Sequence, residues 1–394
     1  MDGVIDVNDM GDKGDIVVLA LNSGSSSFKF GLYRVRAPTA HASGIEPLLS
    51  DSIAMPTPQE AIAGIASRIA EFALAAPQAI GHRIVHGGPA LRQHCVMDDA
   101  VLKQLEAAAP FAPLHTPAAL AVMRAAQECF AGLPHVACFD TVFHADMPDV
   151  ARVLPIPSQL QLEGIQRYGF HGLSCESIVQ QLGDGLPTRL IIAHLGNGAS
   201  ITAIHRGQSI DTSMGLTPTG GVIMGTRSGD LDPGVLVYLM RENKLDGAML
   251  EQLVNHQSGL LGISGVSSDM RRLHQAALSN ANAGLAIQMF CASVAKQIAA
   301  MITVLDGVDL IVFTGGIGEN DALVRTEVCR GLSWIGVSLD EHRNQAVGET
   351  IHNHLDVAIN TTKSRCAVRV VASQEDGQIA RHTWALMPQR HQGT

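Results

Sequence analysis

Short apolar runs, separated by turns rich in glycine and serine, recur along the chain and predict alternating strands and helices. Residues 15–21 (DIVVLAL) and 28–35 (FKFGLYRV) are rich in β-branched and aromatic residues, so we expect a hairpin closed by the turn NSGSSS. Residues 57–76 have the pattern of a helix that begins at Thr57 and Pro58, both typical of helix starts. Further buried strands are expected at residues 79–88 and 135–144.

The second half of the chain repeats this opening pattern. Residues 189–208 (RLIIAHLGNGASITAIHRGQ) again give an apolar strand, a small-residue turn and a second strand. Placing residues 23–27 over residues 196–200 aligns both pairs of strands without a gap. A third strand runs into glycines at residues 309–320 (DLIVFTGGIGEN). The pattern predicts an internally duplicated α/β protein with a phosphate-facing turn in each half.

These turns differ from the commoner nucleotide-binding fingerprints. Lys29 follows Phe28, so the first turn is not a P-loop of the form GxxxxGK[ST]. GNGASI lacks the third glycine of the dinucleotide motif and continues as a strand. Small residues nevertheless let backbone N–H groups approach phosphate oxygens, and serine hydroxyls add donors. We therefore expect the opening turn to be a rigid β-turn at a phosphate site and not a flexible linker.

Composition narrows the class of protein. The chain has 394 residues, of which 46% are hydrophobic and 16% charged, as expected for a globular protein with a large core. A formal net charge of −10 argues against a nucleic-acid surface.

The seven cysteines form no CxxC pair and the N-terminus is polar, so we expect reduced thiols and no signal peptide. Residues 284–305 are apolar but interrupted by Gln288, Lys296 and Gln297, which favours a buried helix over a membrane span. A cytoplasmic protein without nucleic-acid or membrane partners is expected.

Two arginines stand in unusual settings. Arg83 lies in GHRIVHGG and Arg227 in MGTRSGDLDPG, each among small residues that leave room around the guanidinium. An arginine fork binds carboxylate or phosphate oxygens in pairs. The alternative is a structural role, in which Arg227 pins its loop through Asp230 or Asp232.

Histidines and carboxylates supply further candidates. Of 17 histidines, the best placed stand at strand or loop ends beside glycine or proline: His115, His171 and His194. The context RYGFHG favours a function for His171 over a structural role. Asp140 ends an apolar strand and is the best candidate for a buried carboxylate that orients Mg²⁺ or arginine, although it could cap a turn instead. The remaining acidic candidates are Asp269, Glu375 and Asp376. Asp269 could instead be a helix cap, and Glu375 and Asp376 could be simple surface charge.

Seven of these segments, in order, resemble the signatures of the acetate kinase family, over about residues 16–382. They are NSGSSSFK, GHRIVHGG, FDTVFH, RYGFHG, HLGNGAS, GTRSGDLDPG and FTGGIGEN. The family belongs to the sugar kinase, heat-shock chaperone and actin superfamily. The resemblance implies an α/β fold of two duplicated ribonuclease-H-like (actin-like ATPase) domains flanking a cleft, and a homodimer. The expected parts are a polar extension (1–15), a first domain (16–150) completed by a C-terminal helix (377–394), and a second domain (151–376).

The resemblance also implies roles for individual residues. Asn22 and Glu375 match residues associated with Mg²⁺, for which Mn²⁺ could substitute. Asp140 matches an essential aspartate, and His171 a histidine that stabilises the transition state. Arg83 and Arg227 match arginines that hold the substrate carboxylate and the transferring phosphoryl group. The remaining substrate-binding positions are Val85, Leu114, His115, Phe170 and Pro218. The ATP- or ADP-binding positions are Ser26, Lys29, His194, Leu195, Gly196, Asn197, Gly198, Ala199, Asp269, Met270, Arg271, Gly316, Ile317, Gly318, Glu319 and Asn320.

Three departures from the family pattern affect this assignment. RYGFHGLSC has Leu173 and Cys175 where RYGFHGTSH is usual, a change that could alter hydrogen bonding around His171. GLTPTGG replaces GLTPLEG and so loses an acidic residue. SQED replaces T-x-E-E, which leaves the register of the metal-binding Glu375 open by one position.

The reaction expected from this resemblance is the reversible, Mg²⁺-dependent phosphorylation of acetate by ATP, with direct in-line transfer to give acetyl phosphate. Acetate is already ionised at neutral pH, so Asp140 is expected to orient other groups and not to act as a base. Alanine at Arg83 or Arg227 is expected to cut turnover and leave the fold intact. The alternatives are a propionate or butyrate kinase, an inactive homologue, and a non-catalytic nucleotide switch of the actin or chaperone branch.

Overall fold

The computed structural model describes residues 14–23, 28–37, 44–53, 57–112, 116–351 and 356–388. These residues belong to two compact units, one comprising Met1–Val142 and Gln374–Thr394, the other Phe143–Ser373. From the sequence we expected the division after residue 150 and the return to the first domain at residue 377. Most of the expected N-terminal extension and three of the predicted site residues lie outside the described residues: Ser26, Leu114 and His115.

Unit 1 is built on a six-stranded sheet of order β3-β2-β1-β4-β6-β5. The first three strands are antiparallel, β1, β4 and β6 run parallel, and short β5 pairs antiparallel to β6. Its strands are β1 (Ile16–Ser23), β2 (Phe28–Val35), β3 (Ile45–Ile53), β4 (Ala79–Ile84), β5 (Cys95–Val96) and β6 (His135–Phe139). Its helices are α1 (Pro58–Glu71), α2 (Asp99–Ala107), α3 (Thr116–Cys129) and α15 (Glu375–Leu386), with a 3₁₀ turn at Ala109–Phe111. The predicted hairpin and the helix start at Thr57 are confirmed, since the Thr57 side chain accepts a hydrogen bond from the Glu60 amide.

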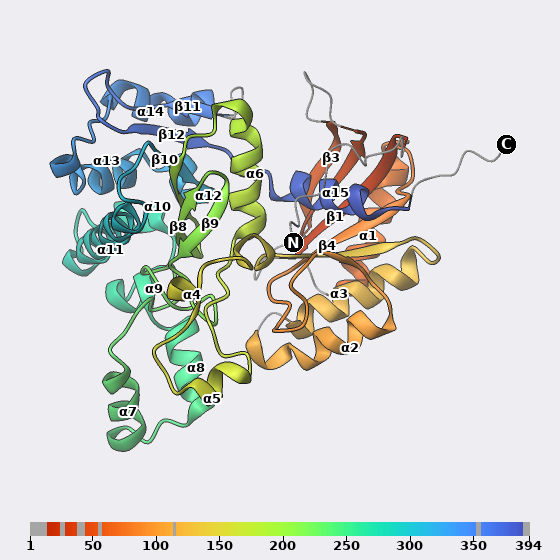
Figure 1. Ribbon diagram of the computed structural model, residues 1–394, viewed down its shortest axis with the longest axis horizontal. Helices are drawn as coiled ribbons and strands as arrows, with labels where there is room; N and C mark the ends of the chain where they lie inside the picture. The colour runs from red at the N-terminus through yellow and green to blue at the C-terminus, as the bar shows by residue number, and fades with distance from the viewer. Residues whose placement is uncertain are drawn as a thin grey trace. The chain divides into compact units, whose positions relative to one another are not determined.

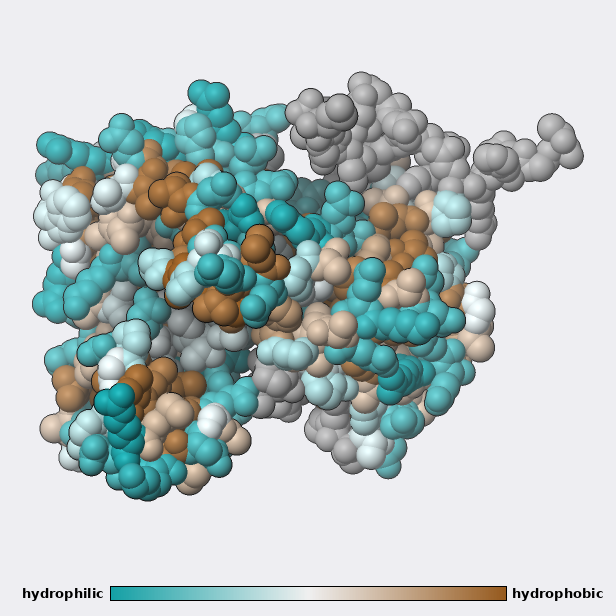
Figure 2. Space-filling model, turned by 60° about the horizontal axis from the view of Figure 1, so that its bottom comes forward, coloured by the Kyte–Doolittle hydropathy of each residue, from teal (hydrophilic) through white to brown (hydrophobic). Residues whose placement is uncertain are grey.

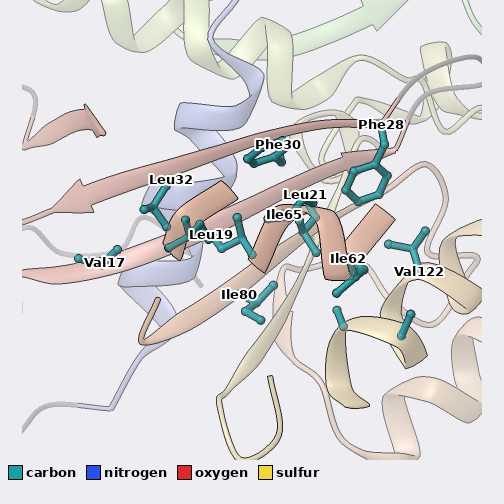
Figure 3. Close-up of a cluster of buried hydrophobic side chains, with 13 residues drawn as sticks. Val17, Leu19, Leu21, Phe28, Phe30, Leu32, Ile62, Ile65, Ile80 and Val122 are labelled. Carbon is teal, nitrogen blue, oxygen red and sulfur yellow. The ribbon is translucent and has the colours of Figure 1, made fainter. Parts of the chain in front are cut away.

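One face of this sheet carries the main hydrophobic core of unit 1. Because side chains alternate along a strand, Val17, Leu19 and Leu21 of β1 point to the same side. Figure 3 shows them beside Phe28, Phe30 and Leu32 of β2, Ile62 and Ile65 of α1, and Val122 of α3. Full burial of each such side chain contributes about 1.5–3 kcal/mol. This packing fixes which residues of β1 face the core, so Asn22 belongs to the alternate set, on the opposite face.

The opposite face of the sheet is covered by α15, which comes from the far end of the chain. The helix packs against β1, β2, β4 and β6 (Figure 1). The approach is so close at Gly81 that a Cβ atom there would stand 2.2 Å from Thr383 Oγ1 and 2.5 Å from Ile379 Cγ2. Glycine at this position of β4 therefore lets the last helix lie directly on the sheet.

Unit 2 repeats the same strand order, read from the other end, as β11-β12-β10-β7-β8-β9. A hairpin and a third antiparallel strand are followed by two parallel strands and an antiparallel edge strand, as in unit 1. Its strands are β7 (Arg189–Leu195), β8 (Ala199–His205), β9 (Gln208–Thr212), β10 (Leu310–Thr314), β11 (Asp356–Ala358) and β12 (Ala367–Val371). The predicted duplication of a ribonuclease-H-like α/β fold is confirmed.

The helices of unit 2 cover its sheet and fill the long insertion between β9 and β10. They are α4 (Asp149–Arg152), α5 (Ser158–Leu162), α6 (Gly172–Leu182), α7 (Pro233–Glu242), α8 (Gly247–His256), α9 (Gly259–Ser264), α10 (Met270–Ala276), α11 (Ala281–Leu305), α12 (Gly315–Asn320), α13 (Ala322–Arg330) and α14 (Glu341–Thr350). Three 3₁₀ turns lie at Val142–His144, Gly183–Gly185 and Ser333–Ile335. Cys175, Ile178 and Leu182 of α6 pack on β7, β8, β10 and β12.

Helix α11 meets the length and hydropathy criteria of a membrane span, with a mean hydropathy of 1.5 in its most apolar window. In the structure it packs against β7, β8 and β9 and against α9, α10 and α13. Its buried side chains recur at helical spacing, among them Ala286, Phe290, Val294, Ile298 and Met301. The helix therefore belongs to the core of unit 2.

The gapless alignment of the two hairpin turns was wrong. Ser23 pairs with Phe28, which leaves four residues between the strands, whereas Leu195 pairs with Ala199, which leaves three. When residues 23–27 are placed over residues 196–200, residues that pair across β1 and β2 do not align with residues that pair across β7 and β8. The duplicated hairpins therefore share their topology but differ in loop length.

Two buried histidines predict a loss of stability in acid. His82 Nε2 and His135 Nδ1 lie 2.8 Å apart, and burial lowers the pKa of His82 to about 3 and that of His135 to about 4. The unfolded histidines titrate near pH 6.5, so below that pH the unfolded state binds more protons and stability falls, by roughly 1.4 kcal/mol per pH unit for His82. Calorimetric melting temperatures should thus drop steadily from pH 7 to pH 4.5.

In the variant His82→Leu/His135→Leu the melting temperature should depend less steeply on pH over that range. His256→Gln, at an exposed position of α8, is the control and should keep the wild-type slope. Equal slopes for wild type and the double variant would contradict the assignment.

Candidate active site

In unit 1 the site is anchored by an ion pair between neighbouring parallel strands. Arg83 lies near the end of β4 and Asp140 directly follows β6, so both reach the carboxyl edge of the sheet. Arg83 Nε donates to both Asp140 oxygens at 3.0–3.1 Å, and Nη2 donates to Oδ2 at 2.6 Å. Asp140 is 1% exposed, so the sequence correctly suggested a buried carboxylate. Its oxygens are engaged by the guanidinium, which favours an orienting role.

Asn22, at the end of β1, extends this pair into a network with α15. Its Oδ1 accepts a hydrogen bond from Arg83 Nη1 at 3.0 Å. Its Nδ2 donates to Glu375 Oε2 at 3.2 Å and to Asp376 Oδ1 at 2.8 Å. Glu375 also lies 3.6 Å from Arg83 Nη1. The structure thus brings together Asn22 and Glu375, as predicted, and adds Asp376.

Asp376 was assigned to surface charge in one reading of the sequence, and that assignment was wrong. Burial raises the pKa of its carboxyl, and the hydrogen bond from Asn22 opposes that rise. The signal that could have found it is the displaced motif SQED, which left the register open by one residue. Glu375 and Asp376 both accept a hydrogen bond from Asn22, so an acid lies beside Asn22 in either register of the motif.

The charge balance of this network fits a divalent cation. Burial raises the pKa of Asp140, and Arg83 opposes that rise through its charge and hydrogen bonds. Burial alone would lower the pKa of Arg83, but the nearby carboxylates raise it above its usual value. Three carboxylates around one guanidinium leave an excess of negative charge when ionised. Oxygen donors with excess negative charge are what Mg²⁺ requires, so Glu375, Asp376 and the Asn22 amide are the residues that could hold it.

In unit 2 the corresponding position is built around two stacked histidines. His194 is the penultimate residue of β7, and His171 directly precedes α6 in the left-handed conformation, with φ of 59°. Their rings lie 4.2 Å apart at an angle of 26°. Each Nδ1 contacts a buried serine hydroxyl, Ser200 at 3.0 Å for His171 and Ser174 at 2.8 Å for His194. Both imidazoles are therefore fixed in orientation.

Arg227 and His171 converge on the glycine turn between β7 and β8. A Cβ atom at Gly198 would stand 3.2 Å from Arg227 Nη1 and 3.4 Å from His171 Nε2. Asp230 and Asp232, the carboxylates of the structural alternative, accept hydrogen bonds from the amides of Gly221 and Gly234. A guanidinium and an imidazole thus lie against the backbone of one glycine, an arrangement of polar groups suited to binding an anion.

His144 supports this arrangement and was missed by the sequence reasoning. It is buried, its Nε2 lies 3.0 Å from the carbonyl oxygen of Phe170, and its Nδ1 lies 2.8 Å from Ser209 Oγ. Burial lowers its pKa to about 4. A Cβ at Gly169, where φ is 74°, would stand 2.8 Å from the ring. His144 therefore fixes the loop that carries His171, and the only signal was its place at the end of the motif FDTVFH.

The other predicted nucleotide-binding residues lie at element ends of unit 2, apart from Lys29, which is exposed on β2. Asp269 caps α10 by accepting from the Arg271 amide at 2.9 Å, so the helix-cap alternative is correct for it.

Glu319 has a structural role, because it accepts hydrogen bonds from the amide of Gly315 at the start of α12 and from that of Ser373 after β12. The other predicted nucleotide-binding residues that lie in strands or helices are Leu195 and Ala199 at the hairpin ends, buried Met270, and Gly316, Ile317, Gly318 and Asn320 of α12. Gly196 and Asn197 lie in the turn itself.

Three of the residues predicted to bind the substrate lie among the described residues of β4, α6 and the loop before Arg227, or next to them: Val85, Phe170 and Pro218. Phe170 is buried, and the carbonyl oxygen of Pro218 accepts a hydrogen bond from Arg227 Nη1 at 3.3 Å. Val85 directly follows β4. Cys175, one of the departures from the family pattern, points into the core, where Sγ lies 3.7 Å from Thr202 Oγ1. The substitution at Cys175 therefore leaves the Ser200 contact of His171 in place.

Comparison with known proteins decides the family. A model described as the acetokinase family matches residues 17–381. The chain belongs to the acetokinase family. Its relatives include proteins named acetate kinase from Methylocella silvestris, 40% identical over 94% of this chain and 98% of that protein, and from Heliobacterium modesticaldum, 39% identical over 94% and 100%.

Solved structures of the acetokinase fold agree with this assignment. A propionate kinase from Francisella tularensis has a TM-score of 0.83 and 34% identity, covering 94% of this chain and 100% of that one. The acetate kinase of Porphyromonas gingivalis has a TM-score of 0.80 and 34% identity, covering 95% and 100%. The chain is thus a kinase with the two-domain actin-like ATPase fold.

Replacing Arg83 with alanine should lower the free energy of unfolding of unit 1 by about 3–5 kcal/mol, because Asp140 would remain buried without its cation. This replaces the expectation that the fold would be unaffected. Fluorescence of Trp384, buried on α15, should report the change in urea denaturation when Trp334 is replaced by phenylalanine.

The matched control is Arg124→Ala, which breaks an exposed pair with Glu106 and should cost no more than about 1 kcal/mol. An effect of Arg83→Ala as small as that of the control would show that the Asp140 pair contributes little to folding.

Proposed function

We propose that this chain transfers the γ-phosphoryl group of ATP to acetate and reverses that reaction from acetyl phosphate and ADP. The observation that carries the proposal is the convergence of Arg227 and His171 on Gly198 at the end of a phosphate-type hairpin turn. Relatives named acetate kinase, about 40% identical over nearly the whole chain, support the choice of acetate.

The residues suit a reaction in which the protein positions and neutralises charge. In-line phosphoryl transfer needs little covalent help, and negative charge spreads over the transferring oxygens. Arg83 and Arg227 hold the acetate carboxylate and the phosphoryl group, and His171 donates to the developing charge. Asp140 holds the Arg83 guanidinium in place through two hydrogen-bonded oxygens. Acetate attacks as the carboxylate, so no side chain must remove a proton.

We further propose that the enzyme requires a divalent cation. Mg²⁺ or Mn²⁺, when bound by Glu375 or Asp376 beside Asn22, neutralises nucleotide phosphate charge. The support is the excess of carboxylates over cations in that network, together with the hydrogen bonds that hold both acids on Asn22. We further propose a cytoplasmic enzyme, in keeping with the reduced cysteines.

A homodimer is also proposed. The family resemblance implies it, and apolar side chains gather on exposed surfaces of the molecule (Figure 2). Exposed Val235, Val237, Tyr238 and Met240 all lie on α7 and are candidates for burial in an interface. Light scattering should give twice the chain mass of 41.6 kDa, and Tyr238→Glu should shift the mass toward one chain. A wild-type mass of a single chain would rule the dimer out.

Trapping acyl phosphate with hydroxylamine tests the reaction directly. With MgATP, hydroxamate should form from acetate faster than from propionate or butyrate, and removal of the cation should stop it. The propionate kinase among the structural neighbours makes the longer acids a necessary comparison, since one methylene contributes only about 1–3 kcal/mol of discrimination. No hydroxamate from any acid would overturn the proposal, and a preference for longer acids would change its substrate.

Arg227→Ala should reduce turnover by about a hundredfold or more, because a donor at the transferring group is lost. Arg343→Ala, on the exposed face of α14, is the matched control and should retain wild-type turnover. Near-normal turnover in Arg227→Ala would assign that arginine a structural role.

A further inference from the structure

A chain of hydroxyl groups ends on the ring of His194. Ser373 Oγ donates to Ser174 Oγ at 2.9 Å, and Ser174 Oγ lies 2.8 Å from His194 Nδ1. Ser174 is fully buried and His194 is 8% exposed. All three residues belong to unit 2, and they come from the loop after β12, from α6 and from β7.

The direction of the bond from Ser373 favours one tautomer of the His194 imidazole, because the fully buried Ser174 hydroxyl needs an acceptor for its own hydrogen. Because Ser373 donates to Ser174, the Ser174 oxygen already acts as an acceptor, and its own hydrogen is available to His194 Nδ1. An Nδ1 that accepts a hydrogen bond carries no proton, so in the neutral ring the proton lies on Nε2. His194 is then a donor at Nε2.

The Nε2 atom faces the backbone of two glycines. It would stand 3.2 Å from a Cβ at Gly315 and 3.9 Å from a Cβ at Gly196. Gly315 opens α12, where its amide donates to Glu319 Oε1 at 2.8 Å. The same Glu319 oxygen accepts from the Ser373 amide at 3.0 Å. One carboxylate oxygen thus holds both the glycine next to Nε2 and the serine that starts the hydroxyl chain.

We propose that Ser174, with Ser373 behind it, is a positioning residue that holds His194 as the neutral Nε2–H tautomer, a hydrogen-bond donor to a nucleotide phosphate beside Gly196 and Gly315. This inference rests on the proposed function for the identity of the ligand. Ser174 itself touches no substrate in this assignment and acts only through the ring of His194.

The tautomer can be read without any assay of activity. In the full chain labelled with ¹⁵N-histidine, two-bond ¹H–¹⁵N correlations should show His194 with a protonated Nε2 and an unprotonated Nδ1 at pH 7.5. The His194→Gln variant identifies its peaks. Ser174→Ala should shift His194 toward a mixture of tautomers, and Ser174→Thr, which keeps the hydroxyl, should restore the wild-type pattern.

Ser177→Ala is the matched control. Ser177 is also buried on α6, and its hydroxyl donates to the Ser174 carbonyl oxygen at 2.8 Å. This variant should leave the His194 pattern unchanged. A protonated Nδ1 in the wild-type protein, or an identical pattern in wild type and Ser174→Ala, would overturn the proposal.

Nucleotide binding supplies the second measurement. Calorimetric titration with MgADP should show a dissociation constant about tenfold larger in Ser174→Ala than in Ser177→Ala. This is the loss of affinity expected for one misplaced hydrogen bond to a charged group. Equal affinities in the two variants would overturn the role toward phosphate. If wild-type protein binds MgADP as expected but forms no acyl phosphate, the proposed reaction fails while the role of Ser174 stands.

Discussion

The parallel pairing of β1, β4 and β6 is the constraint on which the charged network of unit 1 depends. Their carboxyl ends carry Asn22, Arg83 and Asp140, and the register of the sheet brings these side chains to one edge. The guanidinium then sits between an amide oxygen and a carboxylate that the strands hold at fixed separation. A shift of one residue in any of the three strands would turn a member of the network toward the opposite face.

Unit 2 uses the same topology to arrange different chemistry. The ends of β7 and β10 carry His194 and the glycines of α12, and the turn after β7 faces His171 and Arg227. In unit 1 the polar edge is dominated by carboxylates, which suits a cation. In unit 2 it is dominated by donors and glycine, which suits an anion. The duplicated sheet is therefore a shared scaffold whose halves have complementary ligand chemistry.

Local patterns were sufficient to predict most of the strands, the duplication and the residues around Arg83 and His171. The strand ends, Thr57 as a helix cap and the hairpin of β1 and β2 all follow from signals within about ten residues. What the sequence did not reveal depends on distant contacts. Asp376 is half-buried because α15 packs on a sheet whose Asn22 lies 354 positions earlier. His144 and Ser174 act through partners on other elements, and neither residue type carries a local signal for that. The difference in hairpin loop length was hidden because a repeat of small residues aligns equally well in several registers.

The position of α15 has a consequence for synthesis of the chain. The strands of unit 1 are translated before unit 2, but the helix that covers its sheet, with Glu375 and Asp376, is translated after unit 2. Until then Gly81 and its neighbours on β4 lack their covering layer, and Arg83 and Asp140 lack the acids that complete their network. Unit 2 is contiguous from Phe143 to Ser373, and its sheet is fully translated before α15 emerges. We therefore expect the usual N-to-C order of domain folding to be reversed here, with folding of unit 1 delayed until α15 has been translated.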